Sequence, residues 1–281
     1  MTPAGRVQAS IDLLAAVEAA ARRPADAIAN DFFRARRYIG SGDRRAVSEL
    51  AWGAIRQRMR LGWHLAELGQ PASARLLMVA HLLLAEGWPA PKLAGHFIGD
   101  RFAPPTLTPA EIELVRRIAA RRLVDPAMPE DVRLNLPGWA LPGLRARFGA
   151  ALPEEAAAME TAAPLDLRAN LLRTTRDAAR LALAAEGLVA EPMPFSPWGL
   201  RIADRKPVSA TAAFKDGLVE VQDEGSQLIA LLTDARPGMR VADYCAGAAG
   251  KTLALAATMG NRGHIVACDV SATRLDGAGR R

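Results

Sequence analysis

The sequence predicts a multidomain protein that combines an all-helical part, a small α+β module and the start of a Rossmann-like α/β core. Apolar residues recur at helical spacing over residues 7–123, and short alternating, proline-broken segments follow beyond about residue 140. Residues 236–281 then contain a strand, a small-residue turn, a helix and a second strand. We therefore divide the chain into predicted domains at residues 1–135, 136–216 and 217–281.

Composition narrows the class of protein. The 281 residues are 50% hydrophobic and 23% charged, which excludes disordered, collagen-like and coiled-coil proteins. The two cysteines and four histidines lack zinc-ligand spacing, so we expect no structural metal, no disulfide framework and a reducing, cytoplasmic location. Asp12 and Glu18 interrupt any signal peptide, and the apolar window of residues 76–84 is too short for a membrane span. We expect no membrane role.

The positive charge is concentrated in one half of the chain. Residues 1–150 carry 21 Arg and Lys against 14 Asp and Glu, whereas the remaining residues carry 15 against 16. A basic module beside a neutral one favours contact with a polyanion, and nucleic acid is the usual candidate. The alternative is that the arginine bias partly reflects genome composition, because the chain has only four lysines.

The helical part has clear start and stop signals. Helix boundaries are predicted at Ser41-Gly42-Asp43, at Gly69-Gln70-Pro71 and at Thr108-Pro109, where Glu111 completes a capping pattern. This spacing predicts a bundle of five or six helices.

The middle of the chain is broken by prolines and glycines. Residues 125–152 predict a connector with one short helix at 141–148. Residues 165–170 alternate like a strand, 175–186 have helical spacing, and 188–203 are proline-rich and extended. A small α+β module is the expected result.

The last part predicts a βαβ unit. A strand at 218–222 and a helix at 224–233 come first. A short strand of the buried type at 239–244 then runs into the turn CAGAAGKT, a helix at 253–259 and a second strand at 264–268, which Asp269 follows at once.

This βαβ turn is a candidate ligand-binding site. A strand that enters a turn and then a helix offers free backbone N–H groups and the positive end of the helix dipole. Residues 246–250 are all Ala or Gly, so a ligand can approach closely, and Asp269 lies 22 residues after Gly247, near the offset at which an acidic side chain reaches ribose hydroxyls. The sequence therefore predicts a ribose-containing ligand.

Three ligand classes share this geometry. A nucleoside-triphosphate loop and a dinucleotide loop both require glycine where this chain has Cys245, so both are disfavoured. The third class is the methyltransferase fold that binds S-adenosyl-L-methionine (SAM).

The turn resembles a known family. Residues 243–252, DYCAGAAGKT, are similar to the D-x-C-A-x-P-G-G-K-T loop of the NOP/Sun family of RNA cytosine-C5 methyltransferases. Residues 41–56 resemble the NusB-like RNA-binding helical domain of that family, and residues 136–139, 167–170 and 219–227 resemble the segments that lead into its catalytic core.

The resemblance implies a SAM site. It implies that the loop wraps the methionine and sugar, that Asp269 holds the ribose hydroxyls, and that the loop residues are Cys245, Ala246, Gly247, Ala248, Ala249, Gly250 and Lys251. Ala248 and Ala249 stand where the family usually has Pro and Gly, which is expected to change the stiffness or one dihedral angle of the loop. Asp243 is expected to orient the loop by accepting backbone N–H bonds, and Lys251 is expected to contact a carboxylate.

The catalytic cysteines of the family have no counterpart here. Cys245 and Cys268 do not lie in the expected Thr-Cys or Pro-Cys contexts, so no catalytic residue is assigned, and both are expected to be small buried residues. Only residues 270–281 follow the second core strand, so Arg281 is expected to be a truncation point.

Arginines and aromatic residues also cluster in the helical part. They could bind phosphate and stack on bases, or they could equally form a solvated face beside a core stripe. The candidate RNA-binding residues are Arg34, Arg36, Arg37, Arg44, Arg45, Arg56, Arg58 and Arg60.

The function expected from this resemblance is SAM-dependent cytosine-C5 methylation of RNA through a cysteine–C6 adduct, with ribosomal RNA favoured over transfer RNA. The alternative is a non-catalytic RNA-binding protein with a vestigial SAM site. A dehydrogenase is a distant third.

Overall fold

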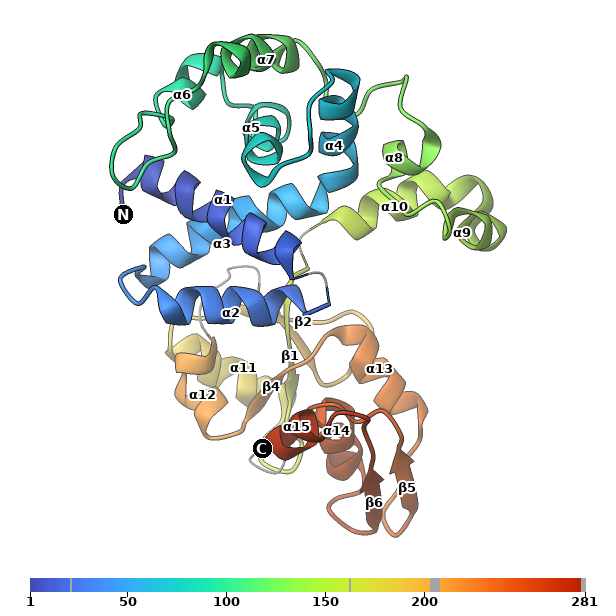
Figure 1. The fold of residues 1–281 in the computed structure, drawn as a ribbon. Helices are drawn as coiled ribbons and strands as arrows, with labels where there is room; N and C mark the ends of the chain where they lie inside the picture. Colours follow the sequence, from blue (N-terminus) through green and yellow to red (C-terminus); the bar gives the residue numbers. More distant parts are fainter. Residues whose placement is uncertain (21, 162, 203–207, 279–281) are drawn as a thin grey trace. The chain divides into compact units, whose positions relative to one another are not determined.

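The computed structural model describes residues 1–20, 22–161, 163–202 and 208–278 (Figure 1). It divides the chain into two compact units, residues 1–161 and residues 162–281. The described residues of the first unit form helices and connecting segments only. These helices are α1 (Pro3–Ala19), α2 (Ala25–Ala35), α3 (Ser41–Arg56), α4 (Arg58–Glu67), α5 (Ala74–Leu84), α6 (Ala90–Ala94), α7 (Pro109–Ala119), α8 (Glu130–Leu134), α9 (Leu141–Phe148) and α10 (Leu152–Glu160).

The first unit contains more helices than the sequence pattern indicates. The described residues up to position 123 hold seven helices instead of five or six, because α6 has only five residues, too few to produce a helical repeat. The predicted helix at residues 141–148 is present as α9, while α8 and α10 were not predicted. The predicted division at residue 135 falls inside the first unit.

Helix α5 lies at the centre of the first unit. Every residue from Leu76 to Leu83 is buried, and α1, α3, α4 and α7 pack around this helix (Figure 1). A helix that is enclosed on all sides has no polar face, which explains the most apolar window of the sequence. Among the described residues, no helix is both long and apolar enough to cross a membrane.

Helices α3 and α5 meet at Gly53 and His81. A Cβ atom at Gly53 would lie 2.6 Å from the His81 ring, so only glycine fits there without a shift of the ring. His81 is 2% exposed, and neither of its ring nitrogens makes a hydrogen bond, although Nε2 lies 3.4 Å from the Glu86 carboxylate. Burial, together with the nearby charge of Arg56, lowers the pKa of His81 to about 4.

A buried ion pair fixes the end of the first unit to its helices. Arg60 on α4 is 6% exposed and lies 2.6 Å from Glu160 on α10. The same guanidinium donates hydrogen bonds to the backbone carbonyl of Arg133 just after the middle of α8. Arg60 is therefore a packing residue that holds α8 and α10 against α4.

The second unit begins with a ferredoxin-like module. Its strands and helices alternate in the order βαββαβ, and the sheet order β2-β3-β1-β4 is antiparallel throughout. This order and topology define a ferredoxin-like fold, which confirms the predicted α+β class. The elements are β1 (Leu165–Ala169), α11 (Arg176–Ala185), β2 (Ala190–Pro192), β3 (Gly199–Ile202), α12 (Ala212–Lys215) and β4 (Val219–Val221). Residue 203, the last of the predicted extended segment, lies outside the described residues.

Strand β1 is buried on both faces. Leu167 and Ala169 pack in the apolar core with α11 and α12. On the opposite face, the Asp166 carboxylate accepts two hydrogen bonds from Arg201, of 2.8 and 2.9 Å, and Arg168 donates to Gln222 at 2.7 Å. The alternation of β1 thus separates an apolar face from a fully paired polar face.

A buried glutamine joins this module to the next helix, α13 (Glu224–Leu232). The Gln227 side chain is fully buried and donates from Nε2 to the carbonyls of Leu167 on β1 and Gln222. Its Oε1 accepts a 2.6 Å hydrogen bond from the Ser196 hydroxyl. One amide therefore links β1, the β2–β3 connection and α13.

The remaining elements form the βαβ unit. Strands β5 (Arg240–Asp243) and β6 (His264–Ala267) pair in parallel, with α14 (Gly250–Thr258) between them in sequence and α15 (Ala272–Ala278) after them. The strands are less buried than their apolar sequences predict, since the Val266 side chain is 46% exposed. The reason is that this sheet has only two strands among the described residues. The buried residues of the small core beside it come mainly from α13 and α14.

We predict that the Gln227→Ala substitution lowers the free energy of unfolding by about 2–4 kcal/mol, because it removes the hydrogen bonds of this buried amide to two backbone carbonyl groups and to the Ser196 hydroxyl and leaves a cavity. Urea unfolding followed by circular dichroism measures the change. Gln70→Ala is the matched control, since Gln70 is exposed and is expected to cost less than about 0.5 kcal/mol. Equal losses for the two variants would contradict the joining role of Gln227.

We also predict an acid-sensitive stability that depends on His81. The folded-state pKa of about 4 lies below the ordinary value of 6.5, so the unfolded chain binds the extra proton first as the pH falls. Stability from this residue is fully present above pH 6.5 and is lost between pH 6.5 and 4, by up to about 3 kcal/mol. Urea unfolding at several pH values should show that His81→Asn removes this slope, whereas His264→Asn, on an exposed strand, keeps it.

Candidate functional site

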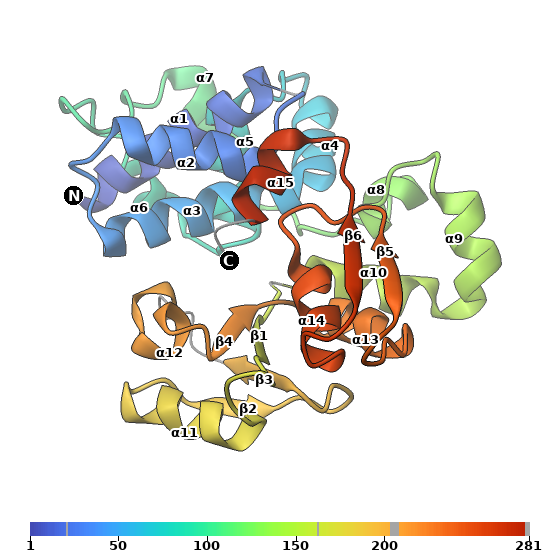
Figure 2. The same cartoon turned by 90° about the horizontal axis from the view of Figure 1, so that it is seen from below.

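The predicted cofactor loop lies at the carboxyl end of β5. Residues 244–249 leave this strand and lead directly into α14, which packs beside the strand pair (Figure 2). The carboxyl ends of parallel strands and the amino end of the following helix meet here, which is where α/β folds bind their ligands.

Hydrogen bonds between the two strand ends hold the loop in place. The Ala246 N–H donates to the carbonyl of Cys268, and the Cys268 N–H donates to the carbonyl of Asp243, both at 2.8 Å. The Asp243 carboxylate accepts a 2.6 Å hydrogen bond from the Thr252 hydroxyl on α14. The sequence predicted that this carboxylate accepts backbone N–H groups; instead it fixes α14 to β5 through a side chain.

Two loop residues adopt left-handed backbone angles. Gly247 has φ 55°, and Ala249, the residue that precedes α14, has φ 64° and ψ 23°. A Cβ atom makes this conformation unfavourable by about 1–2 kcal/mol relative to glycine. Position 249 is where the NOP/Sun loop usually has glycine, so alanine keeps the small size of the loop at the expense of local strain.

Asp269 closes the loop from the end of β6. Its carboxylate accepts the Ser271 N–H at 2.9 Å and the Gly247 N–H at 2.8 Å, and only 6% of the side chain is exposed. The backbone hydrogen bonds from Ser271 and Gly247, with the charge of Arg274, lower the pKa of Asp269. Asp269 is therefore an ionised acceptor at neutral pH that already organises the loop.

Arg274 on α15 lies against the same loop. A Cβ atom at Gly247 would come within 2.6 Å of the Arg274 guanidinium, which is itself 3.9 Å from the Asp269 carboxylate. A ligand that contacts both Gly247 and Asp269 must therefore share this space with Arg274 or displace it.

Lys251 occupies the first turn of α14 and is half-buried. Burial raises the pKa of Asp223, but hydrogen bonds from Ser226 and the nearby charge of Lys251 outweigh it and leave the pKa below its ordinary value. The carboxylate on which Lys251 acts thus belongs to the amino-terminal cap of α13.

The two cysteines differ from the expectation of small buried residues. Cys245 is exposed and Cys268 is partly exposed. Ala246, Gly247 and Ala249 are the buried members of the loop, whereas Ala248 is exposed.

The structure divides the eight candidate RNA-binding arginines into two groups. Arg34, Arg37, Arg44 and Arg45 line one groove between α2 and α3. The others lie elsewhere: Arg36 covers the Phe32 ring at 3.8 Å, Arg56 is exposed at the end of α3, Arg58 pairs with Glu18 at 3.0 Å, and Arg60 forms the buried pair with Glu160.

Sequence reasoning missed the residues that support the site. Gln222 and Gln227 lie in the segment that resembles the family, yet nothing in their spacing indicates a buried amide network. The Gln222 side chain lies close to Gly250. A Cβ atom added at Gly250 would be 3.6 Å from the Gln222 amide nitrogen. The only sequence signal for the Thr252–Asp243 hydrogen bond is that a hydroxyl and a carboxylate stand nine residues apart, one on each side of the loop.

The loop has the chemistry that SAM requires. The ionised Asp269 can accept hydrogen bonds from ribose hydroxyls with its remaining lone pairs, and the loop of Ala and Gly residues leaves its backbone accessible. The residues present therefore fit this cofactor.

Comparison with known proteins supports the same class. The family model "Methyltr_RsmF/B-like, ferredoxin-like domain" matches residues 136–209. The ribosomal RNA small subunit methyltransferase B of Pseudomonas putida is 30% identical over 250 residues, which is 84% of this chain and 57% of that protein. The protein of the same name from Pseudomonas syringae pv. tomato is 30% identical over 246 residues, 83% of this chain and 55% of that protein.

Solved structures have a similar fold. The crystal structure of PH0851 superposes with a TM-score of 0.73 and 19% identity, covering 100% of this chain and 66% of that chain. A methyltransferase homolog protein from Pyrococcus horikoshii has a TM-score of 0.50 and 28% identity, covering 56% of this chain and 52% of that chain.

A helical unit, a ferredoxin-like module and a βαβ unit with a small-residue loop define a multidomain protein of the α and α/β class. Within that class, the chain belongs to the RsmB-like NOP/Sun family, as a homologue of ribosomal RNA small subunit methyltransferase B. The chain spans little more than half the length of the curated relatives that it matches.

We predict that Ala249→Gly stabilises the protein by about 1 kcal/mol, because glycine adopts the left-handed conformation of residue 249 without strain. Urea unfolding measures the gain. Ala246→Gly is the control, since this buried loop residue is not among those with positive φ and is expected to lose stability. A loss for Ala249→Gly of the same size as the control would contradict the strain.

Proposed function

We propose that the chain takes part in SAM-dependent methylation of C5 of cytosine in ribosomal RNA, in the cytoplasm. The observation that carries this proposal is the loop at the end of β5, closed by the ionised Asp269. Homology to small subunit ribosomal RNA methyltransferases supports the choice of RNA. We further propose that the first unit is a NusB-like RNA-binding domain, as its sequence resemblance implies.

Each loop residue has a distinct part in this function. When bound, SAM supplies the methyl group. Asp269 accepts hydrogen bonds from the ribose hydroxyls, and Gly247 and Gly250 let the backbone approach the cofactor. Thr252 and Asp243 keep α14 aligned with β5, so the loop keeps its shape when the ligand leaves.

A non-catalytic RNA-binding role is the second candidate. It is favoured by the environment of the only two cysteines. Cys268 continues β6, where its backbone N–H and carbonyl hold the loop, and the exposed Cys245 begins the loop itself. Neither cysteine is assigned as the nucleophile that attacks C6 of cytosine.

Cofactor binding is the first test of the proposal. We expect isothermal titration calorimetry to show that the chain binds SAM and that Asp269→Asn weakens binding by about tenfold or more, since it replaces a charged acceptor by a neutral amide. Asp234→Asn is the control, because Asp234 is exposed and pairs only with Arg236 among the described residues. No measurable SAM binding by the unmodified chain would overturn the proposed cofactor.

Methyl transfer is the second test. Tritiated SAM and small subunit ribosomal RNA are incubated with the chain, and the labelled nucleoside is identified by chromatography. Label on C5 of cytosine supports the proposal, and label on another base or on protein contradicts it. RNA binding without any transfer favours the second candidate.

A further inference from the structure

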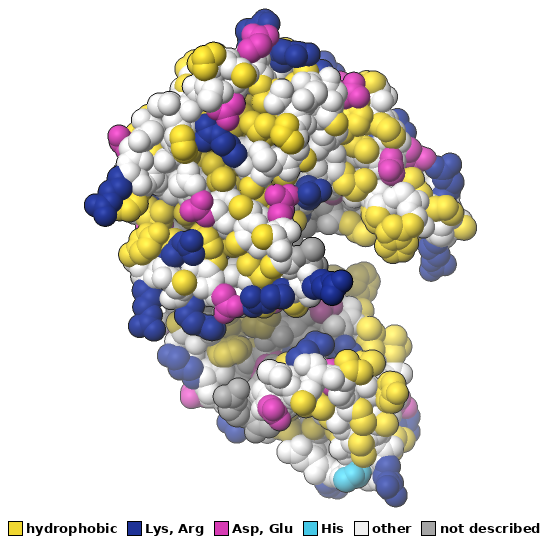
Figure 3. All heavy atoms as spheres, viewed as in Figure 1, with side chains coloured by type: hydrophobic (Ala, Val, Ile, Leu, Met, Phe, Trp, Pro, Cys, Tyr) yellow, Lys and Arg dark blue, Asp and Glu magenta, His cyan; other side chains and the backbone are white. Residues whose placement is uncertain are grey.

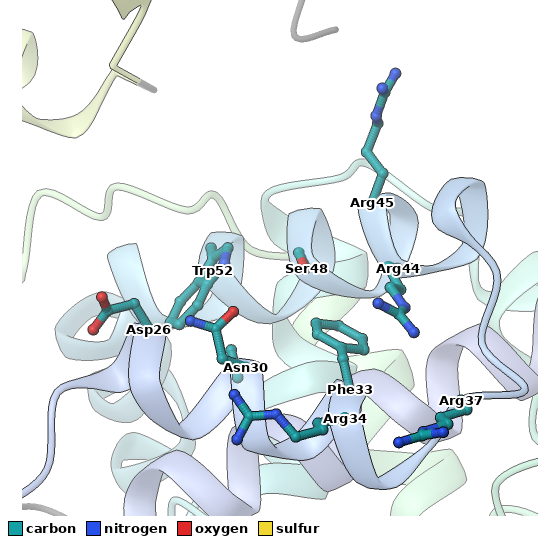
Figure 4. A pocket seen from close by; sticks show the side chains of 10 residues that line it. Asp26, Asn30, Phe33, Arg34, Arg37, Arg44, Arg45, Ser48 and Trp52 are labelled. Carbon is teal, nitrogen blue, oxygen red and sulfur yellow. The ribbon is translucent and has the colours of Figure 1, made fainter. Parts of the chain in front are cut away.

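A groove lies between α2 and α3 in the first unit. It has a volume of about 860 Å³ (Figure 4). Its lining residues are Asp26, Ala29, Asn30, Phe33, Arg34, Arg37, Arg44, Arg45, Ser48 and Trp52. All of them come from α2, α3 and the turn between these helices, so the groove is complete within one compact unit.

The groove is strongly positive. Four arginines and one carboxylate, Asp26, line the groove, and Lys and Arg side chains gather along the edge of the first unit that carries α2 (Figure 3). Arg37 and Arg45 are exposed, and neither forms an ion pair with another described residue. An exposed guanidinium without an internal partner is available to an external anion.

Of the other two arginines, Arg44 is held in position and Arg34 is only weakly paired. The Arg44 side chain donates a 2.8 Å hydrogen bond to the carbonyl of Ile39 and extends toward the Phe33 ring, 5.8 Å from its centre (Figure 4). Arg34 makes an exposed 3.2 Å contact with Asp31, which is a weak pair at the surface. Part of the cationic surface is thus ordered before any ligand arrives.

The floor of the groove is aromatic. Trp52 is half-buried and points from α3 toward α2, while Phe33 is 9% exposed and fixed edge-on against Phe32 (Figure 4). Asn30 and Ser48 add neutral hydrogen-bonding groups beside them. Aromatic faces, neutral polar groups and surrounding cations match a nucleotide, whose base stacks while its phosphates pair with arginine.

We propose that this groove binds unpaired RNA, with a base stacked on Trp52 and the adjoining phosphates on Arg37 and Arg45. A base can reach the Trp52 ring only when it is unstacked from its neighbours, and an A-form duplex does not offer such a base. The inference rests on the proposed RNA-binding role of the first unit, and it adds the form of RNA, the place of binding and the residues that contact it.

The test measures RNA binding to the whole chain by fluorescence anisotropy. A fluorescein-labelled, unstructured 12-nucleotide RNA is titrated at several salt concentrations. We expect the double variant R37A/R45A to bind about tenfold more weakly at low salt and to lower the salt slope by roughly one to two, because each lost phosphate contact removes about 0.7 for single strands. The control R116A/R117A removes two exposed arginines from α7 and is expected to change both values much less.

Two further measurements test stacking and the form of RNA. RNA is expected to quench tryptophan fluorescence, and the conservative Trp52→Phe variant, which keeps the packing, is expected to lose most of this quenching. A duplex of the same sequence is expected to bind more weakly than the single strand. Equal losses for R37A/R45A and the control, unchanged quenching in Trp52→Phe, or equal binding of duplex RNA would each overturn the inference.

SAM titration separates this inference from the proposed function. R37A/R45A is expected to bind SAM as the unmodified chain does, since the groove lies in residues 1–161 and the loop in residues 162–281. Loss of SAM binding in the unmodified chain, with the RNA results as expected, removes the proposed cofactor and leaves the groove intact. The opposite pattern removes the groove alone.

Discussion

The second unit depends on one buried amide. Gln227 has no contact with water, and each end of its side chain has a partner on a different segment: Leu167 of β1, Gln222 before α13, and Ser196 between β2 and β3. Because an unpaired amide in this position is costly, these segments fit together in one arrangement. This arrangement fixes the position of α13, and α14, which follows the loop, packs against α13.

The same logic explains the cofactor loop. Asp269 and Asp243 each end a strand, and each carboxylate ties its strand to the loop or to α14. The loop is therefore shaped from both sides before a ligand binds, and the left-handed Ala249 persists because its neighbours fix it. The groove of the first unit differs from the loop, because Arg37 and Arg45 are exposed and form no ion pair with another described residue. The fold therefore does not require arginine at these two positions.

Much of the fold could be predicted from sequence, because periodicity and turn residues report which side chains face inward. This holds for the strand at residues 165–169, for the βαβ unit and for the helix at residues 141–148, whereas residues 188–203, predicted as one extended segment, contain two strands, and the strand at 219–221 belongs to the ferredoxin-like sheet. The spacing of apolar residues does not show which side chains from distant parts of the sequence will contact each other. Arg60 could not be distinguished from the exposed arginines because its partner Glu160 is 100 residues away, and the exposure of Cys245 and Val266 depends on how few elements cover them. The loop at residues 245–251 could be recognised from sequence because its residues are consecutive and nearly all small.

The contact between Gly53 and His81 has a consequence for sequence variation. Because the imidazole fills the space that a side chain at position 53 would need, the two positions form a size-coupled pair in the packing of α3 against α5. An alanine or serine at position 53 becomes acceptable only together with a smaller residue at position 81. In homologous chains the two positions should therefore covary: a larger residue at position 53 should accompany a smaller residue at position 81, so that the sum of the two side-chain volumes stays nearly constant.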